Sequence, residues 1–277
     1  MTSQSSVTRQ VAQLEEHFGV RLFHRSTRRL SLTDDGDGVL ERARTLIDDA
    51  VAIEELLQGH RTGPTGLVRV GVSVSGAQFL APRLPMLLER HPGLSIELAV
   101  SDERGDMIEN GIDVALRAGE IDDSSLISRR IGLISPIAVA APSYLARAGN
   151  PGHPDDLAGH RCIVSAGHSK STHWRFVGPE GPIQVQVRGN LRVNNTEVAS
   201  RFALSGLGIA LLPGFQVLDQ IRGGQLVRVL RDYPAPSLPI HVIYPSRRNL
   251  AMRTRILMDF LVEQVGDALS ALSEQTF

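Results

Sequence analysis

The first apolar residues of the chain recur at the spacing of a helix. They are separated by steps of four, three and four positions: Val7, Val11, Leu14 and Phe18. This spacing predicts an amphipathic helix over residues 5–18 that ends at Gly19. Residues 20–32 follow and predict a β-hairpin that carries basic residues at its tip.

A second apolar series keeps a single spacing over roughly 20 residues. Its positions are Val39, Ala43, Leu46, Ala50, Ile53 and Leu57. The steps alternate between four and three, which is typical of a helix that pairs with a second chain. A surface helix packed on its own domain shows the same spacing. Flanking acids and the lack of a second apolar stripe favour the dimerisation helix, over residues 33–60.

The pattern changes again after the glycine-rich segment 59–66, which predicts a linker. Strands are expected over 67–74, 94–100, 113–117, 137–141, 162–165, 174–177, 183–187, 191–193, 209–212, 226–230 and 238–244. Helices are expected over 79–90, 106–110, 196–204 and 250–265. Alternation of strands with helices predicts an α/β protein in which helices cover parallel sheets.

Composition limits the class of protein. The 277 residues are 42% hydrophobic and 21% charged, which fits a folded globular chain. No apolar run is long enough to span a membrane, and residues 1–10 are too polar for a signal peptide. Cys162 is the only cysteine, so a disulfide framework is excluded and a cytoplasmic protein is expected.

Charge is distributed unevenly along the first 60 residues. Residues 1–32 hold five arginines against two glutamates, a charge of +3. Residues 33–60 hold eight acids against two arginines, a charge of −6. A small basic head on a chain of net charge −1 indicates a local surface for a polyanion.

The basic head also carries a specific sequence pattern. Its elements are Thr8-Arg9-Gln10, Leu14-Glu15, Leu22-Phe23-His24-Arg25, Arg28 and Leu32-Thr33-Asp34-Asp35-Gly36. This pattern resembles that of the bacterial LysR-type transcriptional regulators, and the resemblance extends over almost the whole chain. It implies a partial winged helix-turn-helix at 1–32, a linker helix at 33–60, and a bilobal effector domain at 67–277. The two lobes resemble periplasmic solute-binding proteins and are Rossmann-like: lobe I at 67–141 and 238–266, lobe II at 142–237. The two crossovers between them are expected near residues 141–142 and 233–239.

The resemblance further implies promoter DNA as a partner. It makes residues 5–18 the recognition helix, whose short polar side chains allow close approach to the major groove. The candidate DNA contacts on this helix and on the wing are Ser5, Ser6, Thr8, Arg9, Arg25, Arg28 and Arg29. A solvated basic surface is the alternative for the arginines. In the family two helices precede the recognition helix, and they are not found before it here. We therefore expect a head that binds DNA weakly or not at all.

A small-molecule effector is expected in the crevice between the lobes, near strand ends and helix N-termini. The candidate effector contacts are Ser73, Ser75, Ser101, Asp102, Arg117, His168, Thr172, Trp174, Asn195 and Thr196. Hydroxyl and amide donors at helix N-termini suit a carboxylate. Alternatively, Asn195 or Thr196 only caps its helix, and Arg117 pairs with a neighbouring acid.

The sequence gives little support for catalysis. Cys162 opens an apolar strand and is expected to be a buried small side chain rather than a nucleophile. His168 and His173 lack partners at metal-ligand spacing. No catalytic residue, metal or cofactor is expected. Two alternatives stay open: a sensor module that no longer binds DNA, and a small-molecule enzyme on the same fold. The resemblance implies a homodimer or homotetramer.

Overall fold

A computed structural model describes residues 4–25, 30–36, 38–40, 42–43, 46–47, 50, 63–102, 107, 111–121, 126–165, 172–245 and 250–269. The head contains helix α1 (Gln4–Phe18) and the antiparallel hairpin of β1 (Phe23–Arg25) and β2 (Leu30–Leu32). Both predicted elements are thus confirmed. Gly19 ends the helix at φ +68°, a conformation that suits glycine. Arg28 and Arg29, at the hairpin tip, lie outside the described residues.

The predicted linker helix is described only in part. All described residues from 34 to 50 are helical, and the Thr33 hydroxyl accepts a hydrogen bond from the Gly36 amide at 3.0 Å. The side chain of Leu46 is 70% exposed. Ile53 and Leu57 lie outside the described residues. Pairing of this helix with a second chain therefore stays a prediction.

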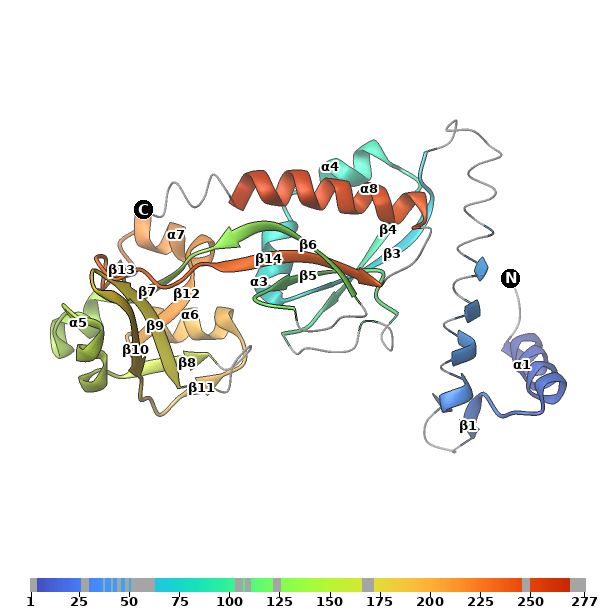
Figure 1. Cartoon of the computed structure of the whole chain (residues 1–277), viewed down its shortest axis with the longest axis horizontal. Coiled ribbons are helices and arrows are strands. Elements are labelled where there is room, and N and C mark those ends of the chain that lie inside the picture. Colours follow the sequence, from blue (N-terminus) through green and yellow to red (C-terminus); the bar gives the residue numbers. More distant parts are fainter. Residues whose placement is uncertain are drawn as a thin grey trace.

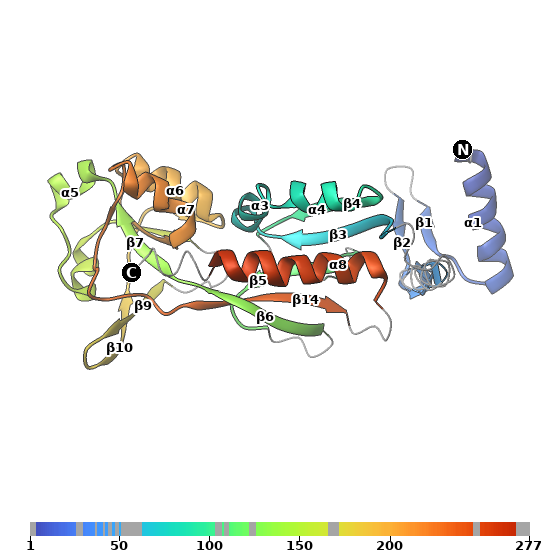
Figure 2. The same ribbon diagram turned by 90° about the horizontal axis from the view of Figure 1, so that it is seen from above.

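Lobe I is built on a five-stranded sheet in the order β4-β3-β5-β14-β6. Its strands are β3 (Gly66–Val72), β4 (Leu94–Val100), β5 (Val114–Ala118), β6 (Leu126–Ile134) and β14 (Leu238–Pro245). Three helices pack against one core on this sheet: α3 (Val74–Leu80), α4 (Leu84–Arg90) and α8 (Met252–Phe260). A π-helical turn, Leu261–Val265, continues α8. Figures 1 and 2 show α8 lying along the sheet.

Lobe II is a three-layer unit on a second five-stranded sheet, β11-β8-β12-β7-β13. Its strands are β7 (Pro136–Ala140), β8 (Cys162–Ser165), β11 (Arg192–Val193), β12 (Ile209–Pro213) and β13 (Val227–Arg228). Helices α6 (Thr196–Leu204) and α7 (Gly214–Arg222) pack on one face. The other face is covered by α5 (Pro142–Ala148), a 3-10 helix (Pro154–Gly159), and the hairpin β9 (His173–Gly178) and β10 (Gly181–Gln186).

The lobe boundaries differ from the prediction. Strand β7, expected in lobe I, pairs with β12 and β13 in the second sheet. The first crossover therefore lies at Ser135, between β6 and β7, and not at residues 141–142. The second lies just before β14, as expected. The hydroxyls of Ser135 and Ser237 are 3.0 Å apart, so the two crossover segments contact each other.

The expectation of purely parallel sheets is wrong. In lobe I, β3 pairs in parallel with β4 and β5, whereas β14 is antiparallel to both β5 and β6. In lobe II, β7 is antiparallel to β12 and β13. The antiparallel strands are those next to the crossovers, because a chain that returns from the other lobe enters its sheet from the opposite end.

Several helices and strands differ from those predicted from the sequence. The helix expected over 79–90 is interrupted, because α3 ends at Leu80 and α4 begins at Leu84. Pro82 lies between them and has no amide hydrogen to continue the helical bonding, and Pro85 occupies the first turn of α4. Strand β6 and helices α5 and α7 were not predicted. The short helix expected over 106–110 lies almost wholly outside the described residues. None of the described helices is long and apolar enough to cross a membrane.

Candidate functional site

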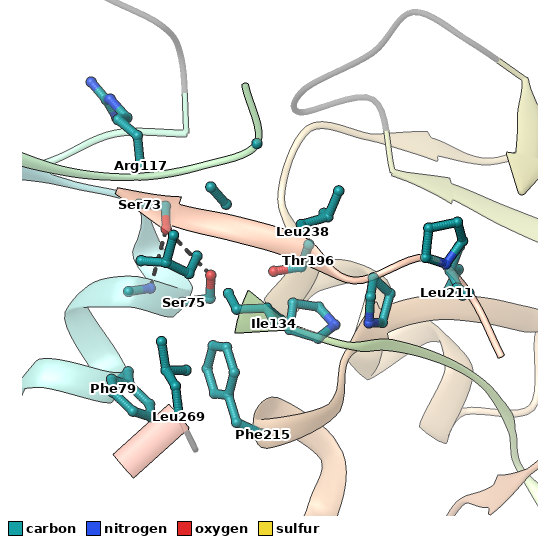
Figure 3. A pocket seen from close by; sticks show the side chains of 18 of the residues that line it. Ser73, Ser75, Phe79, Arg117, Ile134, Thr196, Leu211, Phe215, Leu238 and Leu269 are labelled. Atoms are coloured by element: carbon teal, nitrogen blue, oxygen red, sulfur yellow. Dashed lines mark hydrogen bonds between the residues drawn. The ribbon is translucent and has the colours of Figure 1, made fainter. Parts of the chain in front are cut away.

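A cavity of about 480 Å³ lies between the lobes. Side chains of both sheets and of helices α3, α6 and α7 line it, as Figure 3 shows. Five of the predicted effector contacts are among the lining residues: Ser73, Ser75, Arg117, Trp174 and Thr196. Its volume lies in the usual range for small-molecule sites.

Three hydroxyls form the uncharged polar part of the cavity. Ser73 precedes α3 and caps it, since its Oγ accepts a hydrogen bond from the Gly76 amide at 3.1 Å. The Ser73 and Ser75 hydroxyls are 3.3 Å apart. Thr196 is the first residue of α6 and approaches from lobe II (Figure 3). A ligand that bonds to all three hydroxyls therefore touches both lobes.

Other predicted contacts do not line the cavity. Asp102 and Asn195 instead contact one another, because Nδ2 of Asn195 donates a hydrogen bond to Oδ2 of Asp102. Asn195 also caps α6, its Oδ1 accepting from the Val198 amide at 2.9 Å. Ser101 and Thr172 are absent from the lining, and His168 lies outside the described residues. The capping alternative for Asn195 is thus confirmed, together with a second role between the lobes.

Apolar side chains form the other part of the cavity, and the sequence did not single them out. Phe79 of α3 and Phe215 of α7 meet across the lobes with ring centroids 5.1 Å apart. Val265 and Leu269, from the end of the C-terminal helix, complete this wall. Their sequence spacing is that of core residues, so nothing in the pattern separates a cleft wall from a core.

The charged lining residues are all basic. Arg117 and Arg175 line the cavity together with His173, and none of the described lining residues is an aspartate or a glutamate. In Figure 3 the guanidinium of Arg117 points away from the three hydroxyls. The lining therefore suits a neutral or negatively charged ligand better than a cation.

In the head, a side chain of α1 holds the hairpin in place. The carboxylate of Glu15 in α1 accepts hydrogen bonds from the backbone amides of Leu22 at 2.8 Å and Phe23 at 3.1 Å. It thereby holds the start of the hairpin against the helix. Thr8 and Arg9 are exposed on α1 and Ser6 is half-buried. For Ser5 and Arg25, the structure describes the backbone and not the side chain.

Cys162, the only cysteine of the chain, is buried in the folded protein. Burial raises the pKa of the Cys162 thiol to about 12, so it is protonated near neutral pH. This supports the predicted structural role over that of a nucleophile. No group of three His, Cys, Asp or Glu side chains among the described residues is arranged to hold a metal ion.

Comparison with known families gives two matches that follow the order of the domains. A profile described as "LysR substrate binding domain" matches residues 61–266. A profile described as "Bacterial regulatory helix-turn-helix protein, lysR family" matches residues 1–37. The first alone covers well over half of the chain.

Individual relatives agree with the profiles. The chain is 34% identical over 268 residues to the HTH-type transcriptional regulator CrgA of Neisseria meningitidis, covering 96% of this chain and 89% of the relative. It is 32% identical over 262 residues to the HTH-type transcriptional regulator DmlR of Escherichia coli, covering 94% and 85%. The solved structure of CrgA, titled a LysR-type transcriptional regulator, is similar with a TM-score of 0.67 at 33% identity, covering 95% and 90% of the chains. The full-length virulence activator AphB of Vibrio cholerae is similar with a TM-score of 0.65 at 26% identity, covering 93% and 89%.

Proposed function

The chain belongs to the LysR family of transcriptional regulators, and from that premise we propose that a small anion bound between its lobes controls how the head engages DNA. The relatives favour this regulator over a sensor that no longer binds DNA. One observation carries the proposal: a cavity whose hydroxyl donors, Ser73 and Ser75 from one lobe and Thr196 from the other, face each other.

Because these hydroxyls come from both lobes, a bound ligand can control the angle between the lobes. A ligand that binds both lobes stabilises one angle between them and shifts the population toward it. The hinge is the pair of crossover segments joined at Ser135 and Ser237. Lobe I is connected to the head through the linker helix, so a change of angle is transmitted to the spacing of paired heads. The expected ligand is a small carboxylate, held by hydroxyl donors and by the N-terminus of α6.

DNA contacts are proposed for the polar face of α1 and for the hairpin. Ser5, Ser6, Thr8 and Arg9 approach the major groove, while the arginines of the hairpin contact phosphates or the minor groove.

The exposed Leu46 supports pairing of two linker helices into a dimer, with a tetramer as the larger assembly. A protein without enzymatic activity is proposed, because none of the described lining residues offers a carboxylate to act with a second group in acid–base catalysis. A cytoplasmic location is proposed from the kinship with transcriptional regulators.

Salt-titrated DNA binding tests the proposed function. We expect the full chain to bind fluorescent promoter DNA with a log–log salt slope of several units, by anisotropy. Arg9→Ala is expected to lower the slope by about one unit, because it removes one phosphate contact. Arg90→Ala, an exposed arginine at the end of α4, is the matched control. Absence of binding, or an equal effect of both variants, would contradict the assignment of α1 to DNA.

A second measurement tests the cleft. Thr196→Val keeps the shape of the side chain and removes its hydroxyl. A ligand that changes the DNA affinity of the unmodified chain should do so more weakly in this variant, by roughly tenfold in ligand concentration. An unchanged ligand response would show that the effector does not bind between Ser73, Ser75 and Thr196.

A further inference from the structure

The apolar wall of the cavity is preformed. Phe79 is held on one side by Arg83, whose guanidinium carbon lies 3.9 Å from the ring centroid and whose Nη1 donates to the Phe79 carbonyl at 2.5 Å. Phe215 packs against it from the other lobe at 5.1 Å. Leu269 is only 5% exposed and lies against Gly132 of β6, where an added Cβ would come within 2.8 Å of it. This wall therefore needs no rearrangement to receive an apolar group.

The group of three hydroxyls in the cavity is small by comparison. Figure 3 shows the hydroxyls of Ser73, Ser75 and Thr196 on one side of the cavity, with Phe79, Phe215 and Leu269 on the other. A ligand with a single compact polar group satisfies this arrangement. With its carboxylate on these hydroxyls, a ligand that carries a second charge on the end facing Phe79, Phe215 and Leu269 would place that charge against apolar side chains, and an unpaired buried charge costs several kcal/mol or more.

The charge of the lining restricts the ligand further. Arg117 and Arg175 are its charged members, and none of the described lining residues is an acid. An ammonium group enclosed here would lose its hydration without gaining a carboxylate partner. The lining thus favours a carboxylate and disfavours the amino group that an amino acid carries beside it.

We propose that the effector is a monocarboxylate with an aryl or branched-alkyl body and no amino group. This proposal rests on the proposed function, in that it takes the cavity between the lobes as the effector site. Its carboxylate bonds to the hydroxyls of Ser73, Ser75 and Thr196, and its body lies against Phe79, Phe215 and Leu269. Amino acids, dicarboxylates and sugars are thereby excluded as effectors.

Four probes test this class by calorimetry on the unmodified full-length chain. 3-Phenylpropanoate has the proposed carboxylate and aryl body, L-phenylalanine adds only the amino group, propanoate lacks the body, and succinate carries a second carboxylate in place of the phenyl group. We expect 3-phenylpropanoate to bind about tenfold to a hundredfold more tightly than each of the other three. Propanoate and succinate lack the phenyl group that the apolar wall would bury, and L-phenylalanine carries an ammonium group that would be enclosed without a carboxylate partner. Equal or tighter binding of L-phenylalanine or succinate would overturn the proposal. So would failure of all four to bind.

A pair of variants locates the aryl body. Phe215→Ser should weaken binding of 3-phenylpropanoate about tenfold and leave that of propanoate unchanged. Phe202→Ser, at an exposed position of α6 outside the cavity lining, is the matched control and should change neither. If Phe215→Ser does not fold, the ranking of the four probes on the unmodified chain still tests the proposed ligand class. Equal losses for both probes would place the aryl group elsewhere.

Failure of this proposal is distinguishable from failure of the proposed function. If L-phenylalanine or succinate is preferred and alters DNA affinity through Thr196, the ligand class is wrong and the regulator with its cleft site stands. If the chain shows no salt-dependent DNA binding, the proposed function fails whatever the probes do.

Discussion

Asp102 and Asn195 join the two lobes through a hydrogen bond, in which the Asn195 amide donates to one carboxylate oxygen of Asp102. The other oxygen, Oδ1, accepts from the backbone amide of Val74 at 3.1 Å. Asp102 therefore connects the start of α3 in lobe I to the residue that caps α6 in lobe II. Both helix starts border the cavity, so this contact links their separation to the state of the site.

The first prediction concerns this contact. Asp102→Ala removes the acceptor for Val74 and the partner of Asn195, so we expect the lobes to separate more easily. Amide hydrogen exchange at the start of α3 should become about tenfold faster, since hydrogen bonds to charged groups contribute about 1.5–3 kcal/mol and this one is partly exposed. Asn194→Ala, an exposed neighbour of the same type as Asn195, should leave exchange unchanged. Unaltered protection in Asp102→Ala would show that the contact does not hold the lobes together.

The relation between Asp102 and Asn195 illustrates how far the sequence could lead. Asp102 was singled out because it follows a strand, and Asn195 because it precedes a helix. Both were predicted to contact the effector, yet neither lines the cavity, and they contact each other instead. Their contact joins residues 93 positions apart and depends on the angle between the lobes. No local pattern encodes such an angle.

The apolar wall of the cavity could not be predicted from the sequence. Phe79, Phe215 and Leu269 have the spacing of core side chains, and Phe79 and Leu269 are as buried as core residues. Whether such a side chain meets another side chain or an empty cavity is decided by tertiary packing alone. Strand β6 was missed for a related reason: it is an edge strand with four consecutive exposed residues, so its apolar alternation is weak.

A second prediction concerns the tie between α1 and the hairpin. Glu15→Ala removes an acceptor from two backbone amides, which must then be satisfied by water. We expect the head to lose about 1–2 kcal/mol of stability and DNA binding to weaken equally for all sequences. Circular dichroism during thermal unfolding and anisotropy provide the two readouts. Glu16→Ala is the matched control, because Glu16 is exposed on the same helix. Equal stability of the two variants would contradict the role of Glu15.

Two glycines in the linker helix give a third prediction. An added Cβ at Gly36 would lie 2.0 Å from the Leu22 carbonyl oxygen, whereas at Gly38 nothing lies within 4 Å. Gly36→Ala is therefore expected to push the helix away from the hairpin and destabilise the head by about 1–3 kcal/mol. Gly38→Ala should stabilise the helix by about 0.5–1 kcal/mol, since alanine has the higher helix propensity. Thermal unfolding measures both, and the same sign for both changes would refute the packing at Gly36.

The last prediction uses the single thiol of the chain. Cys162 is 2% exposed, and burial raises its pKa to about 12, so the reactive thiolate is scarce in the folded state. Labelling by a thiol reagent at pH 8 should be about a hundredfold or more slower in the folded chain than in denaturant. Because the folded pKa lies above the ordinary value of 9.0, the contribution of the neutral thiol to stability is complete below pH 9 and is lost as the pH rises toward 12. Cys162→Ala should remove that part of the alkaline loss, measured by unfolding at a series of pH values. Rapid labelling of the folded chain would show that β8 opens readily or that the thiol is not buried.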